Sequence, residues 1–400
     1  MPKFLAIFYI CSFITVIFLT VSFATLSKSD RKSHKNEKKN TKSDVQSAND
    51  VSYKENSIAK KAISSQDIID EHKSYSVSKA ITKNFDHEVL AYVTPWNNHG
   101  YDIAKLFAAK FTMISPVWLQ MKPKDNKGAV LIEGLHDIDE NWMSTLRQHN
   151  KKLKIVPRII LEQWTYPLLK PLLKEKAATD DASAELVNLA KKKSFDGYVI
   201  EIWSLLGGQM KMELTKFLVR LANLLQHHGL SLILVIPPPS YSGGETGMFN
   251  RQDFENLVDH ITAFSLMSYD YSSRQRSGPN SPLNWLLHCV EDLIPDKSSP
   301  NRKKLLLGLN FYGYDYSSGS GKPIVGHEYI GVLEKHNPKL VFHNNSGEHS
   351  LTYWSENVKH EVFFPTLYSI SIRMQLAKEL KTGLAIWEIG QGLDYFYNLL

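Results

Sequence analysis

The sequence predicts an α/β fold: a (β/α)8 TIM barrel with a small α+β insertion between its seventh and eighth strands. Short apolar runs alternate with helical stretches along the chain, which is the pattern of a parallel sheet. The chain has 400 residues, and a barrel of this kind needs roughly 250. No glycine-rich phosphate turn follows the first strand, which argues against a doubly wound open sheet.

Eight strands are expected from the apolar runs. They cover residues 89–93, 111–119, 153–161, 194–203, 230–236, 261–270, 304–312 and 384–389. In the fourth strand, Val199, Glu201 and Trp203 share one face, because strand side chains alternate. If that face lines the barrel interior, Glu201 is a charged group in a packed core, which requires a partner or a task.

The last two strands are separated by about seventy residues, too many for an ordinary connection. Strand-like runs at residues 340–342, 350–354 and 360–364 precede an amphipathic helix at 368–380. We therefore expect an α+β insertion over residues 314–370, mounted on a barrel domain that spans residues 81–400.

The first residues predict a signal peptide over residues 1–24. Lys3 precedes an apolar run at residues 4–20, and the small residues Ser22 and Ala24 occupy the positions that a signal peptidase reads. A signal anchor is the alternative, since the apolar run up to Leu26 is long enough to span a bilayer. Cleavage would give a secreted or lysosomal protein with no stable membrane span.

Residues 25–80 form a basic, low-complexity segment for which disorder is expected. Within it, residues 27–80 hold 12 Lys and Arg against 8 Asp and Glu, while the whole chain has a net charge of +6. The barrel domain is therefore nearly neutral, and no nucleic-acid partner is expected.

Few other residues point to a chemistry of their own. Cys289 lies in an apolar helical context that predicts a buried small hydrophobe. Asn344 begins an Asn-Asn-Ser acceptor for N-glycosylation. No spacing of His, Cys or acidic residues indicates a metal site, and no cofactor is expected.

Aromatic residues gather at the predicted carboxyl ends of the strands, where barrel proteins place their sites. Indole faces stack on the C–H faces of sugar rings, while carboxylates and phenols bond to hydroxyls. The pattern thus predicts an oligosaccharide ligand. The predicted ligand-binding residues are Tyr92, Trp96, Trp118, Glu201, Trp203, Met267, Tyr269, Asp270, Tyr312 and Trp387.

Several of these motifs resemble glycoside hydrolase family 18. The pair Asp196-Gly197 is similar to the start of its fourth-strand signature, and residues 267–270 are similar to its sixth-strand Met-x-Tyr-Asp. Trp387 resembles its eighth-strand tryptophan. Residues 25–30, 92–97, 114–119, 266–271, 308–313 and 392–397 further resemble one branch of the family, the chitinase domain-containing proteins. This resemblance implies chito-oligosaccharide and related amino-sugar ligands, and traffic to lysosomes with a scavenger receptor as partner.

The resemblance also bears on catalysis. When the chain is aligned from Asp196-Gly197, the position of the family's catalytic glutamate falls on Trp203, and an indole cannot donate a catalytic proton. Glu201 lies one inward step deeper in the strand. The sequence therefore predicts a protein that is not an enzyme but a chitinase-like lectin, for which the resemblance implies a role in sensing pathogen glycans.

Two alternatives remain open at this point. One is a weak glycosidase whose acid is displaced to Glu201 or Asp270. The other is a receptor-binding protein of the secretory pathway whose sugar site is vestigial.

Overall fold

The computed structural model describes residues 47–48 and 59–400, which include the whole predicted barrel domain. The predicted signal peptide and most of the basic segment lie outside the described residues. Within the described part of the chain, none of the helices combines the length and the apolar character needed to cross a bilayer.

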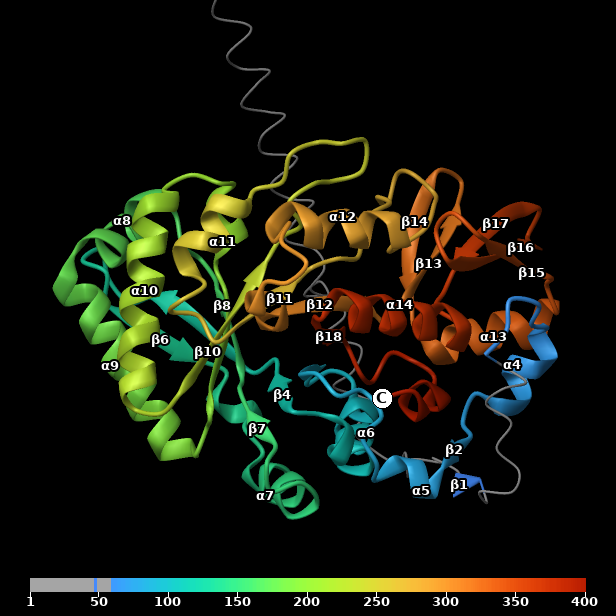
Figure 1. Cartoon of the computed structure of the whole chain (residues 1–400), viewed down its shortest axis with the longest axis horizontal. Helices are drawn as coiled ribbons and strands as arrows, with labels where there is room; N and C mark the ends of the chain where they lie inside the picture. Colours follow the sequence, from blue (N-terminus) through green and yellow to red (C-terminus); the bar gives the residue numbers. More distant parts are fainter. Residues whose placement is uncertain (1–46, 49–58) are drawn as a thin grey trace, which may run out of the picture.

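Eight parallel barrel strands form the centre of the molecule, and the predicted (β/α)8 fold is confirmed (Figure 1). Two of them are interrupted, so that the second consists of β4 and β5 and the third of β7 and β8. Because β4 pairs with β7 while β5 pairs with β8, these broken strands join the two ends of the curled sheet. The strands are β3 (Val89–Val93), β4 (Met113–Pro116), β5 (Leu119–Pro123), β7 (Lys154–Ile155), β8 (Arg158–Leu161), β9 (Gly197–Glu201), β10 (Ser231–Ile236), β11 (Ala263–Leu266), β12 (Leu305–Asn310) and β18 (Gly383–Trp387).

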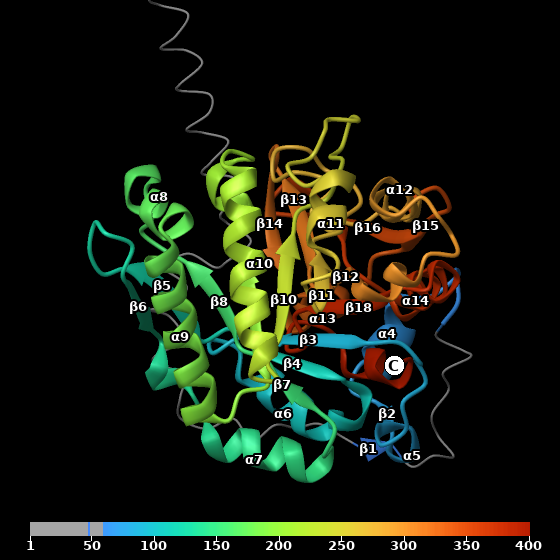
Figure 2. The same cartoon turned by 60° about the vertical axis from the view of Figure 1, so that its left-hand side comes forward.

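Helices cover the outside of the barrel, with α8, α9 and α10 packed side by side along one flank (Figures 1 and 2). Each begins or ends at a recognisable signal. For example, α10 stops before Gly229, whose φ of +72° lies in the region that favours glycine. The helices are α6 (Asn98–Leu106), α7 (Glu140–His149), α8 (Tyr166–Lys174), α9 (Lys176–Lys193), α10 (Lys211–His227), α11 (Arg251–Leu257), α12 (Leu283–Leu293) and α14 (Leu367–Leu380).

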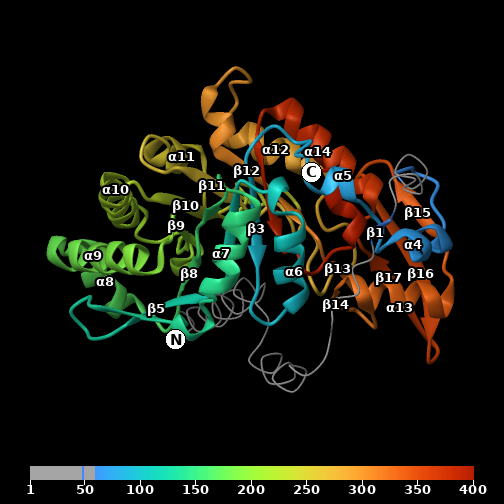
Figure 3. The same ribbon diagram turned by 90° about the horizontal axis from the view of Figure 1, so that it is seen from below.

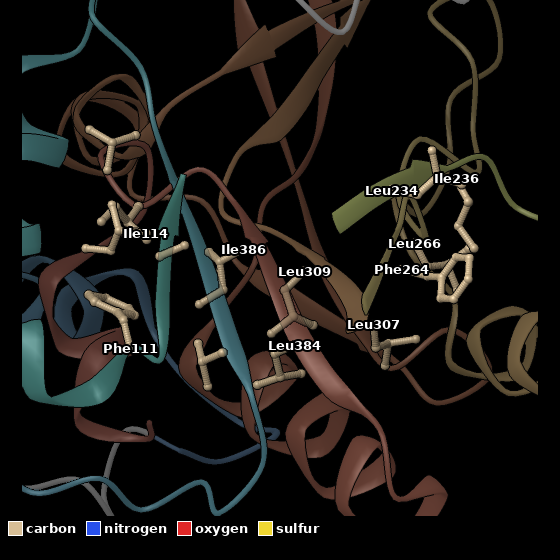
Figure 4. Packing of buried hydrophobic residues seen from close by; sticks show 14 of the residues in the cluster. Phe111, Ile114, Leu234, Ile236, Phe264, Leu266, Leu307, Leu309, Leu384 and Ile386 are labelled. Atoms are coloured by element: carbon tan, nitrogen blue, oxygen red, sulfur yellow. The ribbon is translucent and has the colours of Figure 1, made fainter. Parts of the chain in front are cut away.

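The alternation of strand side chains produces two separate apolar clusters. The larger, which we call the outer core, lies between the strands and the helices and includes Leu234, Phe264 and Ile386 (Figure 4). The smaller, the inner cluster, fills the barrel interior and includes Leu90, Val199 and Ala385. Full burial of one large apolar side chain contributes about 1.5–3 kcal/mol, so the outer core dominates the stability of the fold.

A five-stranded antiparallel sheet follows β12 and lies beside the barrel (Figures 1 and 3). Its strand order is β14-β13-β17-β16-β15, and α13 packs on one of its faces. The sequence shows the last three strands as apolar runs, but it gives no indication of β14, which contains glycine and proline. The elements are β13 (Gly313–Ser317), β14 (Ser320–Ile324), α13 (Gly326–His336), β15 (Leu340–His343), β16 (Glu348–Ser355) and β17 (Val358–Phe363).

The segment before the barrel is partly folded where the sequence predicts disorder. Residues 59–80 contain α4 (Ser65–Glu71), β2 (Tyr75–Ser76) and α5 (Val77–Ala80). Ile68 is buried, and the Ser65 Oγ donates to the Pro338 carbonyl at 2.6 Å. A capping box at Ser64 and these contacts with the insertion outweigh the basic composition that led to the expectation. In the barrel domain, Cys289 lies in α12 and its side chain is buried, as predicted.

Candidate active site in the barrel mouth

Most of the predicted site residues meet inside the barrel, at the carboxyl ends of its strands. The Tyr92 and Trp387 rings lie 5.1 Å apart between centroids, and those of Tyr269 and Tyr312 lie 6.3 Å apart. The Tyr312 hydroxyl donates to the Asp270 carboxylate at 2.5 Å. Met267 and Trp96 are half-buried at the edge of the same cluster. We call Tyr92, Arg158, Glu201, Tyr269, Asp270, Tyr312 and Trp387 the mouth cluster.

Trp203 lies outside the barrel interior, which corrects the expectation that it lines the site. Strand β9 ends at Glu201, and Ile202 leaves the extended conformation with φ −136° and ψ −26°. Trp203 then opens a short 3-10 helix, so the alternation of the strand no longer applies to it. Its indole is 1% exposed in the outer core, 4.9 Å from the Phe249 ring between centroids.

Trp118 is a second correction of the same kind. It lies between β4 and β5, where the second barrel strand is interrupted, and its side chain is fully buried in the outer core. Its Nε1 donates to the Tyr101 hydroxyl at 2.7 Å, and Trp142 packs edge-on against it. A ligand in the barrel mouth cannot reach this indole.

Arg158 is the partner that Glu201 requires, and sequence reasoning missed it. Its Nε and Nη2 both donate to the Glu201 Oε2, the Nε at 2.8 Å. The guanidinium is 2% exposed and lies 5.5 Å from the centre of the Trp387 ring, whereas Glu201 keeps a quarter of its side chain exposed. The sequence did contain an indication of this partner, because Arg158 is a charged residue within the apolar run 155–161. Charged residues are rarely buried unless they are paired or functional.

Asp270 is held in an unusual way at the end of the sixth strand. Its backbone has φ of +60°, a left-handed conformation that non-glycine residues adopt mainly at constrained sites. The Asp270 N–H donates to the Asn280 side chain at 2.6 Å, which fixes this conformation. The hydroxyls of Tyr312 and Tyr314 both donate to the Asp270 Oδ1. Burial raises the pKa of Asp270 despite these two phenol bonds.

Tyr314 and Tyr316 of the insertion also belong to the inner cluster and were missed as site residues. The signal was present, because Tyr312, Tyr314 and Tyr316 recur at a spacing of two and therefore share one strand face. The insertion thus contributes one wall of the mouth.

A buried carboxyl group joins the loop that carries Trp96 to the end of strand β18, where Trp387 lies. Glu388 is fully buried, and it accepts hydrogen bonds from the Asn97 Nδ2 at 2.7 Å and the Gly390 N–H at 3.0 Å. Burial raises the pKa of Glu388 to about 7, and these hydrogen bonds oppose that rise. Glu388 therefore fixes the first and eighth strand ends relative to one another.

The described residues contain no group of three or more His, Cys, Asp or Glu arranged to hold a metal ion. The chemistry available in the mouth is that of carboxyl groups, phenols, one guanidinium and indoles. Such a set suits the binding of a polyhydroxylated ligand and proton transfer to it.

The barrel with carboxyl groups and aromatic rings at its mouth defines a carbohydrate-active α/β-barrel protein. Residues 88–392 match the model of glycosyl hydrolases family 18, so the chain belongs to this family. The family resemblance predicted from the sequence is confirmed.

Individual proteins are similar to this chain over most of its length. The cortical fragment-lytic enzyme of Bacillus subtilis (strain 168) is 21% identical over 330 residues, which cover 79% of this chain and 74% of that protein. The crystal structure of a chitinase from Chromobacterium violaceum ATCC 12472 has a TM-score of 0.66 at 19% identity and covers 78% of this chain and 98% of that one. A mutant family 18 chitinase from Cycas revoluta, solved in complex with (GlcNAc)4, has a TM-score of 0.60 at 16% identity, with coverages of 78% and 97%.

These relatives overturn the prediction that the protein is not an enzyme. They are named as a lytic enzyme and as chitinases. The prediction depended on Trp203 standing where the catalytic acid would be, but the structure places Trp203 in the outer core. The last inward side chain of β9 is Glu201, so the strand still presents a carboxylate to the mouth.

Proposed function

We propose that the protein is a glycoside hydrolase that binds glycans of N-acetylated amino sugars in the barrel mouth and cleaves their glycosidic bonds. The observation that carries this proposal is the pair of carboxyl groups in different environments, Asp270 beneath two phenols and Glu201 beside a guanidinium. Hydrolysis in family 18 is substrate-assisted, with the sugar's own N-acetyl oxygen as nucleophile, so one carboxyl group can donate the proton while the other stabilises the positive charge that develops. The complex of the Cycas revoluta chitinase with (GlcNAc)4 supports the class of ligand.

Asp270 is assigned as the proton donor. Burial raises its pKa, which favours the protonated form that a general acid needs. Both phenol hydrogen bonds end on Oδ1, so Oδ2 is the oxygen that can carry the proton toward the leaving glycosidic oxygen. As the C–O bond breaks, this proton passes to the leaving oxygen while the sugar's N-acetyl oxygen bonds to the anomeric carbon. Water then adds to that carbon, the N-acetyl oxygen leaves it, and a proton of the water returns to Asp270.

Glu201 is assigned the complementary role of a fixed negative charge. The Arg158 guanidinium holds this carboxylate in place, and positive charge develops on the sugar ring in the transition state. The Trp387 ring, next to both Tyr92 and Arg158, supplies a flat apolar face on which that sugar can stack.

The test is incubation of the purified protein with chitotetraose, followed by mass spectrometry of the products and fluorescence titration of the tryptophans. Shorter oligomers are expected to accumulate with time. A tetramer that binds but stays intact would overturn the hydrolytic assignment. A tetramer that neither binds nor is cleaved would overturn the ligand class.

The narrower branch assignment remains a proposal: a stabilin-interacting chitinase-like protein that passes through the secretory pathway and is glycosylated at Asn344. Asn344 is exposed in the turn between β15 and β16, where an oligosaccharyltransferase could reach it. Sequencing the mature N-terminus of the expressed protein tests the passage through the secretory pathway, and membrane-bound protein that retains Met1 would contradict it. The mass of the protein before and after glycosidase treatment tests the glycosylation of Asn344, and an unchanged mass would contradict it.

A scavenger-receptor partner belongs to the same branch proposal. Pull-down with the receptor's extracellular part should lose recovery when residues 27–58 or the insertion are deleted. Unchanged recovery with both deletions would contradict this partner.

A further inference from the structure

One face of the insertion sheet continues the wall of the barrel mouth. The strand register places Tyr314 opposite Phe363 and Tyr316 opposite Glu361, and Phe363 lies opposite Ser350 on the next strand. Tyr314, Tyr316 and Phe363 belong to the inner cluster of the barrel. This face therefore begins inside the proposed site.

The same face extends away from the barrel along β16 and β17. Thr352 pairs with Glu361, and Trp354 pairs with Lys359, so all four side chains follow Phe363 and Ser350 on one side of the sheet. Trp354 is four residues beyond Ser350, which is roughly 14 Å at about 3.4 Å per residue. Figure 1 shows β13 and β14 on the barrel side of this sheet and β15 farthest from the barrel.

Exposure increases along this face. Tyr314, Tyr316 and Phe363 are buried at the barrel end, Glu361 is half-buried, and Thr352 is exposed. Trp354 is 63% exposed, whereas each of the other seven tryptophans is buried or half-buried. The indole that the fold leaves in solvent thus stands at the outer end of a face that starts in the mouth.

The opposite face of the same strands is occupied. Tyr353 stacks on His360 at 4.5 Å and donates to Asp315 at 2.6 Å, and His336 of α13 covers its ring. The face of the sheet that packs on α13 therefore carries Tyr353 and His360. Because side chains alternate along a strand, Trp354 lies on the opposite face, which is the one that continues from the barrel mouth.

Polar groups on this face can bond to hydroxyls. The loop that follows Asp270 reaches the sheet here, since the Ser277 Oγ donates to the Glu361 carboxylate at 2.5 Å. Among the described residues, the buried hydroxyl of Tyr316 has no hydrogen-bond partner. A buried hydroxyl without a partner is costly, which favours a ligand group at this place.

We propose that Trp354 is a distal binding platform for the same glycan that enters the barrel mouth, and that the protein therefore recognises long chains of N-acetylated amino sugars over short ones. The occupant is the far end of that chain, which stacks one sugar ring on the indole. This inference rests on the proposed function, because it assumes that the near end of the chain lies in the mouth.

The test uses thio-linked N-acetylglucosamine oligomers, which resist cleavage, in lengths of two, four, six and eight sugars, with binding measured by isothermal titration. In the wild type, affinity should rise with length until the chain reaches Trp354. Trp354→Ala should weaken binding of the longest oligomer roughly 2- to 12-fold, the range of one aromatic contact. Trp354→Phe should retain most of the gain. Ile81→Ala, which alters a side chain that is 76% exposed outside this face, should bind the longest oligomer like the wild type.

The outcomes separate the two proposals. Equal affinity of wild type and Trp354→Ala for every length would overturn the distal platform and leave the mouth site standing. The same fractional loss for two and for eight sugars would also overturn it, because a distal contact cannot act on a dimer. No binding of any oligomer to the wild type would overturn the proposed function itself.

Discussion

The two faces of the same barrel strands bury different chemistry. Outward side chains such as Leu234 and Phe264 form a dry apolar core against the helices. Inward side chains become polar toward the carboxyl ends, where Arg158 meets Glu201 and the Tyr92 hydroxyl donates to Ser265. The outward side chains mainly stabilise the fold, whereas the inward side chains include buried charged groups that reduce stability but form the site. Substitutions on the two faces should therefore affect different measurements.

The largest expected effect is on catalysis, from Asp270→Asn on the inner face. Loss of the proton donor should lower the rate of chitotetraose cleavage roughly 10²- to 10⁴-fold with a much smaller change in binding. Because the pKa of Asp270 is raised, wild-type activity should fall as the pH rises through that pKa. The residual activity of the variant should not show this decrease. Kinetics over a range of pH measure both.

The matched control is Asp253→Asn, which removes a buried carboxylate on the helix side that pairs with Lys211 at 2.6 Å. It should leave kcat and its pH dependence close to the wild type. A variant Asp270→Asn that retained full turnover would exclude Asp270 as the acid.

The next effect is on stability, from Trp203→Ala on the outer face. Removing this buried indole should lower the free energy of unfolding by about 3–5 kcal/mol, because the outer core cannot close over so large a cavity. Urea denaturation measures the loss. A change in the free energy of unfolding below 1 kcal/mol, together with altered sugar binding, would contradict the burial of Trp203 in the outer core and would indicate that it lines the barrel mouth.

Glu388 should make stability depend on pH. Its pKa is about 7 in the folded protein against an ordinary value of 4.5, so the folded state binds the extra proton between these values. Stability should therefore decrease as the pH rises through this window, by about 3 kcal/mol relative to Glu388→Gln. Denaturation of both proteins at pH 5 and pH 8 measures the difference, and parallel changes in the two would contradict the assignment.

The smallest effect compares two tyrosines that each donate one hydrogen bond of 2.8 Å. Tyr92 donates to Ser265 in the barrel interior, and Tyr198 donates to the Leu186 carbonyl in the outer core. Each change to Phe should cost about 0.5–1.5 kcal/mol of stability. Only Tyr92→Phe should also weaken glycan binding. Equal binding by both variants would show that the inner face does not contact the ligand at this depth.

Much of the fold was predictable because the strands are regular. The runs at 89–93 and 230–236 are short, almost entirely apolar and bounded by loops, so their assignment as buried barrel strands follows from local sequence, and within a strand the side chains alternate between its two faces. The alternation also gives the inward direction of Tyr92 and Glu201. These inferences depend only on neighbours in the chain.

The errors occurred where a strand ends or where a partner is distant. By its spacing from Val199 and Glu201, Trp203 should point into the barrel, but the backbone leaves the extended conformation at Ile202. The sequence pattern does not show the exact residue at which a strand ends. The ion pair of Arg158 and Glu201 joins residues 43 positions apart. The buried Glu388 carboxyl group is bonded to Asn97, which is 291 positions away in the chain. Only the tertiary structure brings these groups together.

The central claim is that the mouth cluster is the place where the glycan binds and reacts. A crystal structure of the protein with thio-linked chitotetraose tests it directly. We predict that one sugar ring will lie on the Trp387 indole, with its glycosidic sulfur within hydrogen-bond reach of the Asp270 carboxyl group. Ligand density elsewhere on the molecule, with an unoccupied barrel mouth, would contradict this claim.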